Sequence, residues 1–374
     1  MSTSPERRRI AYFALDVPHK GQASYVHIQE ISANLRRLGW TVDLFAPVPR
    51  AAGARQHLLA KFAGFARVSL RAIVALPRYD ILYGRSHPLA WPVTWMARLF
   101  GLVVIQEING LEGDITLTYP KLARLRPLIR WLYTSQYRAA DHLFPVSREL
   151  YEIIRRRIDQ RPMTVIPNGA NTDLFRPIDR AVDRPFVVFF GGLAIWHGVE
   201  MMMDALRRPS WPVGVELVVI GTGPEQKVVE RAVAAGLPVR WLGYQPYESI
   251  PGLIAGAIAA LIPIIDPSSR GTGAQHPLKL YEAMAAGLAV IVTNLPGQSE
   301  LVRAEQCGLI VPQGDAAALA EAVAQLAHNE AEAKAMGGKG CEAVRKSHSW
   351  AMRAATISGI LRDCMHGRTR APTH

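Results

Sequence analysis

Short apolar runs alternate with helical segments along this chain of 374 residues, and the alternation starts afresh near residue 184. In the first series the run 9–15 is followed by a helical segment at 25–38 and by a second run at 41–47. That β-α-β order is typical of a parallel sheet covered by helices on both faces. Because the second series has its own glycine-rich strand ends, the sequence predicts two Rossmann-like, doubly wound α/β domains.

The remaining strands are predicted from apolar runs that end in a glycine, a proline or a polar residue. We expect strands at 80–85, 102–108, 142–147, 163–169, 184–193, 215–224, 239–244, 259–264, 289–292 and 308–312. A polar, proline-bearing segment near 175–185 separates an expected N-terminal domain (1–180) from a C-terminal one (181–345). We expect 346–374 to be a helix that packs back on the first domain, with a flexible tail. Ligands of such sheets bind beyond the carboxyl ends of the strands, so the crevice between the domains is the expected active site.

The positive charge of the chain is confined to its N-terminal half. Residues 1–180 hold 26 Lys and Arg against 14 Asp and Glu, whereas the rest of the chain holds 17 of each. Acidic residues are missing from 44–79 and from 115–140. A basic half indicates an anionic partner, such as a lipid phosphate, a membrane surface or a nucleic acid. We expect no nucleic acid, because no basic-and-aromatic recognition motif accompanies the charge.

The composition, 49% hydrophobic and 20% charged residues, is normal for a soluble globular protein. The three cysteines form no CxxC pair, so neither a disulfide framework nor a zinc site is predicted. The N-terminus lacks the long apolar stretch of a secretory signal, and the longest apolar run, 250–265, is broken by two prolines. We therefore expect a cytoplasmic protein that can attach peripherally to the inner face of the cell membrane.

The segment 276–294 (HPLKLYEAMAAGLAVIVTN) is predicted to form a helix, a glycine stop at Gly287 and a buried strand. Glu282 lies on the first turns of this alanine-rich helix. The surface is the usual place for a lone glutamate, so its role depends on the motifs around it. The relevant segments are 19–47, 165–177 (VIPNGANTDLFRP), 189–200 (FFGGLAIWHGVE), 218–224 (VVIGTGP) and 276–294 itself.

In order and spacing, these segments resemble the retaining GT-B glycosyltransferases of family 4, and the resemblance covers nearly the whole chain. It implies a GT-B fold and transfer of a sugar from a nucleotide-diphosphate sugar to an acceptor, with retention of configuration. In that family the glutamate that matches Glu282 accepts hydrogen bonds from the ribose hydroxyls. A carboxylate suits a cis-diol because it accepts two donors, so we expect Glu282 to bind the donor.

The resemblance also indicates the other donor-binding positions. The loop 271–278 and the helix that follows would form an anion site for the diphosphate. Lys279 would add a cation there, unless it is a solvated surface lysine. Gly243 and Tyr244 match the segment that borders the nucleobase. The complete expected donor set is Gly21, Gly192, His197, Gly243, Tyr244, Gly273, Ala274, Gln275, Lys279 and Glu282.

The chain departs from the family pattern at several of these positions. Gly192 and His197 stand where the family often has Arg and Lys, whose charges neutralise the leaving diphosphate. Ala274 stands where the family often has a second glutamate. Near the N-terminus, Gly21-Gln22 stands where the family usually has two glycines. His197 is the expected substitute cation. These departures leave a second interpretation open: a non-catalytic GT-B binding subunit of a glycan-assembly complex.

In the first domain, two polar side chains follow strands at positions where the family faces the donor sugar. We expect His87 to orient or protonate the substrate, with a loop-packing histidine as the alternative. Glu107 is expected to hydrogen-bond the sugar or the acceptor hydroxyl. An acid at the end of an apolar strand is costly without a partner, which favours a role for Glu107.

Neither a metal nor a redox cofactor is predicted. The chain contains no DxD motif, and the acidic pair Glu112 and Asp114 is expected in a loop. An NAD oxidoreductase is disfavoured because neither glycine loop has the full dinucleotide fingerprint with an acid about 20 residues on. The nucleotide-sugar is thus expected as a substrate, with no separate cofactor.

The segment 54–76 has helical periodicity. Leu58, Phe62, Phe65 and Ile73 line its apolar side, and Lys61, Arg67 and Arg71 line its basic side. Both an ordinary core-packed helix and a membrane-surface helix fit this pattern. We expect a packed helix whose basic side meets membrane phosphates, each charge contributing about 1 kcal/mol near an anionic bilayer. The expected acceptor is anionic and lipid-linked, as in cell-envelope polysaccharide or glycolipid assembly.

Overall fold

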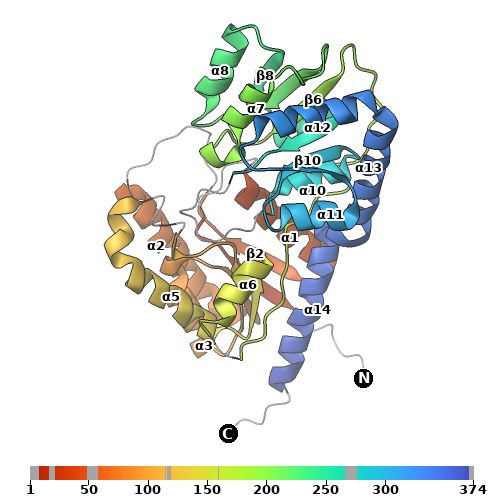
Figure 1. The fold of residues 1–374 in the computed structure, drawn as a ribbon. Helices are drawn as coiled ribbons and strands as arrows, with labels where there is room; N and C mark the ends of the chain where they lie inside the picture. Colours follow the sequence, from red (N-terminus) through yellow and green to blue (C-terminus); the bar gives the residue numbers. More distant parts are fainter. Residues whose placement is uncertain are drawn as a thin grey trace. The chain divides into compact units, whose positions relative to one another are not determined.

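The computed structural model describes residues 8–16, 22–48, 58–113, 115, 119–158, 160–265 and 276–369. Within these residues the chain forms two compact units, which Figure 1 shows in sequence colours. Unit 1 holds the described residues up to Pro167 and those from Ala351 onward, and unit 2 holds those from Asn168 to Trp350. Each unit contains one parallel sheet.

Unit 1 is built on a five-stranded sheet in the order β2-β1-β3-β4-β5. Its strands are β1 (Arg9–Phe13), β2 (Thr41–Phe45), β3 (Ile81–Arg85), β4 (Val103–Ile108) and β5 (His142–Pro145). All the pairings are parallel, and the register sets Arg85 beside Glu107 at the carboxyl ends of β3 and β4. Strand β4 is buried along its whole length, as expected for a parallel strand covered on both faces.

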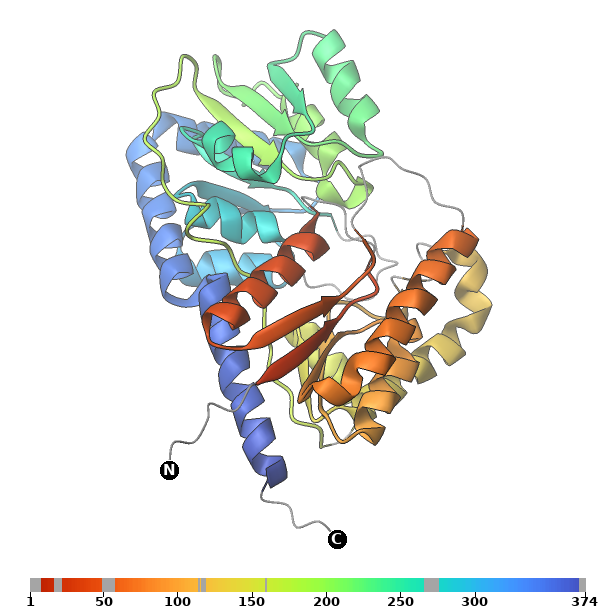
Figure 2. The ribbon, with the colours of Figure 1, turned by 180° about the vertical axis from the view of Figure 1, so that it is seen from behind.

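Helices cover both faces of the unit 1 sheet. They are α1 (Ala23–Arg37), α2 (Leu58–Ala75), α3 (Trp91–Leu99), α5 (Arg126–Ala139), α6 (Arg148–Arg155) and α14 (Trp350–Thr369), with the short turns η1 (Leu76–Arg78), η2 (Pro88–Ala90) and η3 (Pro120–Leu125). Residues of α2, α3 and α5 share one core with Ala11, Phe13 and Leu15. Figure 2 shows α1 on the other side of the sheet from α2.

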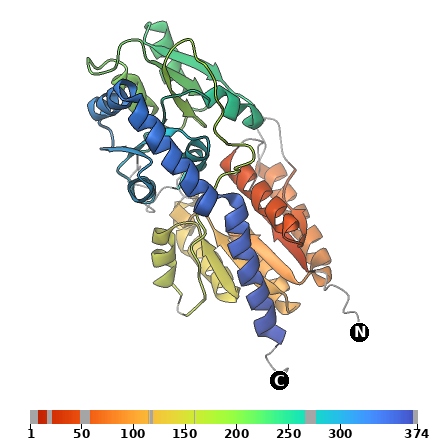
Figure 3. The ribbon, with the colours of Figure 1, turned by 90° about the vertical axis from the view of Figure 1, so that its right-hand side faces the viewer.

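The C-terminal helix α14 belongs to unit 1 from Ala351 onward. The indole N–H of Trp40 donates a hydrogen bond of 2.8 Å to the hydroxyl of Ser358 on this helix. Ala354, Ile357 and Leu361 are buried, which gives α14 an apolar side. Figure 3 shows α14 as the darkest blue helix, which follows α13 and η6 along the chain.

Unit 2 is built on a six-stranded sheet in the order β11-β10-β9-β6-β7-β8. Its strands are β6 (Phe186–Phe190), β7 (Glu216–Ile220), β8 (Val239–Gly243), β9 (Ala259–Ile262), β10 (Ala289–Thr293) and β11 (Gly308–Val311). The order turns back at β6, because β7 lies on one side of it and β9 on the other. Such a reversal point is where parallel α/β sheets bind ligands.

The helices of unit 2 connect its successive strands, except for the last ones, which follow β11. They are α7 (Val199–Ala205), α8 (Gln226–Ala234), α9 (Ile250–Ile254), α10 (Leu278–Ala285), α11 (Gln298–Glu305), α12 (Ala316–His328) and α13 (Glu330–Ala343), with the short elements η4 (Ile195–His197), η5 (Tyr247–Ser249) and η6 (Val344–His348). Phe189 faces a core with α7 and α12, whereas Phe190 faces a core with α10. Every residue of α10 is buried.

Two details of the expected fold differ from the structure. The segment 163–169 forms only a single bridge, between Met163 and Leu143, although it runs beside β5 with the Thr164 and Ile166 N–H groups donating to that strand. Pro162 and Pro167 have no N–H to extend the ladder. On α2, Phe62 was expected among the buried residues but is 52% exposed. Over the described residues, none of the helices combines the length and apolar character needed to cross a bilayer.

Candidate functional site

The carboxyl ends of β6, β7 and β8 meet in a set of glycine loops. The N–H of Gly191 donates to the carbonyl of Ile220, and the N–H of Gly221 donates to that of Gly243. A Cβ on Gly221 would lie 1.9 Å from the carbonyl oxygen of Gly191, and one on Gly223 would lie 2.5 Å from that of Leu193. Glycine is therefore required at 221 and 223, because any side chain there would prevent the loops from packing together. Loop packing thus explains both glycines.

Lys279 on α10 is buried beneath these loops. Its Nζ lies 4.0 Å from the centroid of the Phe189 ring, and a Cβ on Gly191 would lie 3.1 Å from the same atom. Only 8% of the residue is exposed, and no described residue forms a hydrogen bond with its Nζ. The alternative of a solvated surface lysine is therefore wrong.

The buried environment changes the protonation of Lys279. Burial lowers its pKa from 10.5 to about 7, and the charge of Glu282 only partly opposes that shift. An amine without a hydrogen-bond partner loses solvation without compensation, which favours the neutral form. Any anion that enters beside Gly191 would restore the ammonium form.

Glu282 lies one turn further along α10 and is 5% exposed. The hydroxyl of Tyr247 donates a hydrogen bond of 2.7 Å to its Oε1. The Tyr247 ring lies 5.5 Å from that of Phe175, centroid to centroid, so Phe175 supports the residue that binds the carboxylate. The surface position considered for Glu282 is therefore wrong. Tyr247 was not predicted from the sequence, because nothing in the residues around it marks a partner 35 positions away.

His197 and Gly192 lie around the same aromatic ring as Lys279. The Nδ1 of His197 contacts the carbonyl oxygen of Gly192, and its ring lies 6.2 Å from that of Phe189. Since a carbonyl only accepts, Nδ1 carries the proton and Nε2 is the nitrogen that gains one when the imidazole becomes a cation. Gly198, which follows, has φ +65°, and a Cβ there would lie 2.0 Å from the Pro263 carbonyl oxygen.

The other expected donor residues lie at the end of β8 or outside the residues that the structure describes. Gly243 has φ +63° and ends β8, and the Tyr244 ring beyond it is 54% exposed. Gly21, Gly273, Ala274 and Gln275 lie outside the described residues. The structure thus brings together Gly192, His197, Lys279 and Glu282 around Phe189 and α10, with Gly243 and Tyr244 two strands away from β6 in the same sheet.

In unit 1, Glu107 lies at the carboxyl end of β4 and is 2% exposed. Its Oε1 accepts from Arg85 at 2.7 Å and from Asn109 at 2.6 Å. Its Oε2 accepts from Tyr83 at 2.9 Å and lies 2.9 Å from Nε2 of His27. Both oxygens are thus occupied by residues of unit 1.

This network fixes the charge of Glu107. The His27, Arg85 and Asn109 contacts outweigh burial and hold the pKa of the carboxyl well below its usual range. Arg85 also pairs with Asp16, and both carboxylates raise the pKa of its guanidinium against the effect of burial. The arrangement gives Glu107 a structural role in unit 1, and the direct sugar contact expected from the sequence remains a prediction.

His87 caps the short helix η2. Its Nδ1 accepts from the N–H of Leu89 at 3.2 Å, and its ring stands edge-on to Phe65 at 5.5 Å. Burial lowers its pKa from 6.5 to about 4, with the Asp16 charge opposing and Lys61 adding to the shift. His87 is therefore neutral at pH 7 with its proton on Nε2, which suits a hydrogen-bond donor better than a proton-releasing acid.

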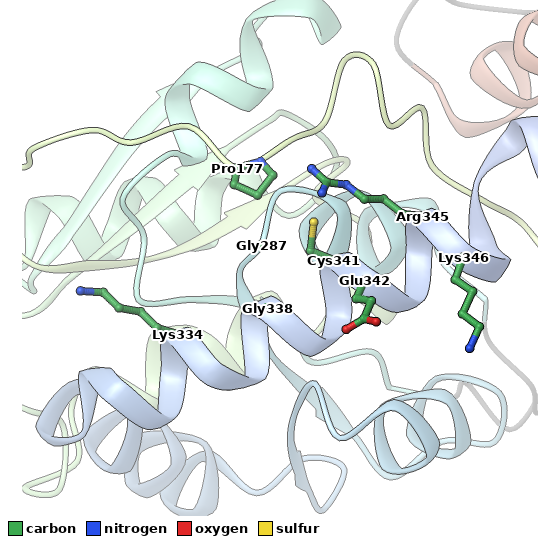
Figure 4. A pocket seen from close by; sticks show the side chains of 8 residues that line it. All are labelled: Pro177, Gly287, Lys334, Gly338, Cys341, Glu342, Arg345 and Lys346. Atoms are coloured by element: carbon green, nitrogen blue, oxygen red, sulfur yellow. The ribbon is translucent and has the colours of Figure 1, made fainter.

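Two further observations concern other parts of the molecule. No group of three or more His, Cys, Asp or Glu residues with the geometry of a metal site occurs within the described ranges. An open basic pocket of about 760 Å³ lies beside Gly287, at the amino end of β10, and includes Lys334, Arg345 and Lys346 (Figure 4). This pocket lies at the end of the sheet opposite to Lys279 and Glu282, so it is separate from the candidate site.

The helix α2 differs from its expected orientation. Lys61 donates a hydrogen bond of 3.1 Å to the Tyr119 hydroxyl, and its Nζ lies 5.6 Å from the centroid of the Phe65 ring. Arg67 and Arg71 are exposed, as expected. Lys61 therefore does not belong with them on a free basic side, because it is held by unit 1 itself.

Comparison with known proteins agrees with this architecture. The family described as "Glycosyltransferase Family 4" matches residues 25–174, and "Glycosyl transferases group 1" matches 184–329. The phosphatidyl-myo-inositol mannosyltransferase of Mycobacterium leprae is 30% identical, over 94% of this chain and 95% of that protein. The chain belongs to the group 1, family 4 glycosyltransferases. The resemblance inferred from the sequence is thereby confirmed.

Solved structures confirm the GT-B fold of this glycosyltransferase. Sucrose-phosphate synthase from Thermosynechococcus elongatus superposes with a TM-score of 0.77 at 20% identity, covering 96% of this chain and 100% of that one. HepE from Anabaena, solved in complex with UDP, has a TM-score of 0.70 at 16% identity, with 95% and 100% coverage. At these identities the likeness extends to the fold, and the substrates of this chain must be argued from its own residues.

Proposed function

We propose that this glycosyltransferase transfers a sugar from a nucleotide-diphosphate sugar to an anionic, lipid-linked acceptor in cell-envelope polysaccharide or glycolipid biosynthesis. The observation that carries the proposal is the pair Lys279 and Glu282 on α10. Both are more than nine-tenths buried, and both lie at the strand-end loops of unit 2. A buried amine and a buried carboxylate one turn apart suit the two polar parts of a nucleoside diphosphate.

Each part of the donor has a matching group in this proposal. The diphosphate lies by Lys279 and the Gly191–Gly192 loop, where the ammonium form gains a partner that none of the described residues supplies. The ribose diol lies on Glu282, whose Oε1 is already held by Tyr247. The exposed Tyr244 ring stacks on the base. When the bond from the sugar to the diphosphate breaks, the leaving oxygen carries negative charge, which Lys279 and protonated His197 stabilise.

We further propose retention of configuration and charge neutralisation by side chains rather than by a divalent ion. Retention rests on the family resemblance, and metal independence rests on the position of Lys279 against Gly191. Turnover that survives a chelator would support metal independence, and nuclear magnetic resonance of the product's anomeric proton would report the stereochemistry.

The proposed acceptor and location rest on the charge of unit 1 and on one relative. Residues 1–180 carry the whole excess of positive charge, and the Mycobacterium leprae relative is named as an enzyme acting on phosphatidyl-myo-inositol. We propose peripheral attachment to the inner face of the cell membrane, with Arg67 and Arg71 of α2 meeting lipid phosphates.

A thermal-shift screen against UDP-, GDP- and ADP-sugars tests the donor assignment. A ligand present at 100 times its dissociation constant should stabilise the protein by about 2.7 kcal/mol. The matched pair of variants is Glu282→Gln in the site and Glu300→Gln on α11, an exposed glutamate of the same unit. Stabilisation that survives Glu282→Gln unchanged would contradict the ribose assignment.

An assay of transfer and hydrolysis with the same nucleotide-sugars separates the enzyme from a non-catalytic binding subunit, the interpretation that Gly192, His197 and Ala274 left open. A subunit that kept only the binding function would be stabilised by a nucleotide-sugar yet would neither transfer nor slowly hydrolyse it. We expect hydrolysis in the absence of acceptor and faster turnover when a lipid-linked acceptor is present.

A further inference from the structure

Three of the helices that pack on one face of the unit 1 sheet, α2, α3 and α5, present an unusual outer surface. Helix α2 contacts α3, and α3 contacts α5. Figures 1 and 2 show these helices side by side, at one side of the sheet. Large apolar side chains are exposed along them: Phe62, Leu70, Val74, Trp95, Leu99, Leu128 and Trp131. We call this surface, together with Trp91, the aromatic-basic face.

Three tryptophans lie together at the centre of the face, where α3 meets α5. The Trp91 ring lies 6.3 Å from that of Trp95 and 6.0 Å from that of Trp131. The indole N–H groups of Trp91 and Trp95 both donate to the Ser135 hydroxyl, at 3.1 and 3.0 Å. The rings are thus held in place, while Trp95 and Trp131 remain 40% and 54% exposed. A folded chain has no internal need for such a cluster at its surface.

The charges on the same helices are of one sign. Helices α2 and α3 and the segment from η3 through α5 contain nine Lys and Arg and no Asp or Glu. Arg67, Arg71, Lys121, Arg124, Arg126 and Arg138 form no ion pair with any described residue. By contrast, α1 carries Glu30 and α14 carries Asp363. The positive charge and the exposed apolar groups therefore coincide on one face.

We propose that the aromatic-basic face docks on an anionic lipid bilayer, with Trp95, Trp131 and the neighbouring leucines entering the interfacial layer while the arginines contact phosphates. Tryptophan rings favour the boundary between headgroups and acyl chains, and each Lys or Arg near an anionic leaflet adds to the attraction. The proposal rests on the membrane attachment proposed above and extends it. It moves the centre of the contact from α2 to α3 and α5 and adds an apolar anchor to the charges.

A bilayer fits these residues better than a macromolecular partner does. Leu99 and Leu128 are 76% and 52% exposed and have no polar atoms with which to read a base or a peptide. A nucleic acid would match the charge but leave these leucines in water, and a protein would need an acidic and apolar face of the same extent. An anionic bilayer supplies both an apolar layer for the leucines and, just above it, phosphates for the arginines. Tryptophan favours the boundary between these two layers.

Flotation of the full-length protein with vesicles of phosphatidylcholine, with and without phosphatidylglycerol, tests the proposal. The variant is Trp95→Ser with Trp131→Ser, and the control is Val213→Ser with Val233→Ser, which removes exposed apolar groups from unit 2. We expect the parent and control to bind phosphatidylglycerol vesicles, and the tryptophan variant to bind about tenfold more weakly. Brominated lipids should quench the parent's fluorescence and the variant's much less.

A second variant, Leu99→Ser with Leu128→Ser, gives the same test if the tryptophan variant does not fold, as judged by circular dichroism. Undiminished vesicle binding by a folded variant would overturn the proposal, and so would a parent that binds no vesicles but self-associates through this face. Calorimetry with UDP and GDP on the same samples distinguishes the two proposals. Nucleotide binding without vesicle binding refutes the docking face and the proposed membrane attachment but leaves the donor site standing, and vesicle binding without nucleotide binding refutes only the proposed donor site.

Discussion

The amine of Lys279 lies 4.0 Å from the centre of the Phe189 ring and forms no hydrogen bond with a described residue. The ring offers its negative face to the ammonium form, but it does not replace the lost water, and the pKa of the amine falls to about 7. A buried amine kept in this state is a cost to folding unless a ligand uses it. The buried position of Lys279 therefore affects both the stability of the protein and its binding of the donor.

We predict that Lys279→Met stabilises the protein and weakens donor binding. At pH 7 the variant removes a buried, unpaired polar group, which should raise the free energy of unfolding by about 1–3 kcal/mol. The pKa is lower in the folded protein than in the unfolded chain, so between pH 7 and 10.5 the unfolded chain binds more protons and the parent's stability rises with pH. The gain from the variant should shrink accordingly. Chemical denaturation at pH 7 and pH 10 measures it.

Calorimetry supplies the binding half of that prediction. Binding of a nucleoside diphosphate should take up a proton at neutral pH, detectable as a heat that depends on the buffer, and Lys279→Met should abolish this uptake. Lys227→Met on α8, which replaces an exposed lysine of the same unit, should change neither stability nor binding. A Lys279→Met protein that binds the donor as tightly as its parent would rule out a diphosphate role.

The Glu282 carboxylate yields a second prediction. Glu282→Ala should weaken nucleotide-sugar binding by about 1.5–3 kcal/mol, because hydrogen bonds to a charged group are lost. Tyr247→Phe removes the 2.7 Å hydrogen bond to Oε1 while keeping the ring beside Phe175, so it should cost less. Glu300→Ala is the control. Unchanged affinity for Glu282→Ala in calorimetry would leave the ribose without its proposed partner.

The positions of these residues were predictable to different degrees. The apolar runs predicted all eleven described strands to within a few residues, because burial on both faces of a parallel sheet leaves a continuous apolar run. One further expected strand, 163–169, forms only a bridge. The helix-forming residues of 276–287 also predicted helix α10. The motif around Glu282 favoured a donor-binding position over a surface one, and the structure shows the residue buried. The hydrogen bond from Tyr247 was not predictable, since it joins η5 to α10 across a fold that local patterns do not describe.

The errors arose where several positions of one helix had to be assigned to a face. Lys61 was grouped with Arg67 and Arg71 on the basic side of α2, but it donates a hydrogen bond to Tyr119 of another segment of unit 1. Phe62 was expected in the core, yet Phe65, Val68 and Ala72 define the buried side. The sequence gives the angles between side chains around the helix axis. Which of those side chains are buried depends on the elements that pack beside the helix.

Removing the charge of Glu107 should destabilise unit 1. Glu107→Gln leaves Arg85 and His27 with a neutral partner in a buried site, and breaking such a pair costs about 3–5 kcal/mol. Because the folded pKa lies below the ordinary 4.5, this contribution is present above that pH and is lost as the pH falls further. Parent and variant should therefore converge in acid. Glu152→Gln, an exposed glutamate on α6, is the control, and denaturant midpoints across pH 3–7 measure the effect.

If Glu107 instead touched the sugar directly, Glu107→Gln would leave the midpoint unchanged and lower only turnover. The same series would detect that outcome, because turnover and stability are measured on one preparation.

His197 is predicted to act as a cation beside the diphosphate. Its Nδ1 faces the Gly192 carbonyl, so the proton gained on forming the imidazolium resides on Nε2. Turnover should fall as the pH rises and that proton is lost. His197→Lys should keep activity at high pH, whereas His197→Ala should lose activity throughout. Indifference of the rate to both substitutions would refute the role.

The charges of α2 supply the last prediction. Arg67→Gln with Arg71→Gln removes two exposed charges from the aromatic-basic face and leaves Lys61 on Tyr119. Vesicle binding should weaken by about 2 kcal/mol if both lie near an anionic surface, and added salt should reduce the difference, since charges are screened over about 8 Å at physiological ionic strength. The matched control is Lys227→Gln with Arg231→Gln, which removes two exposed charges at the same i, i+4 spacing from α8 of unit 2. Folding and nucleotide binding should survive in both variants, because neither pair contacts Lys279 or Glu282. Equal flotation of the α2 variant and its parent would mean that Arg67 and Arg71 do not contact the membrane phosphates.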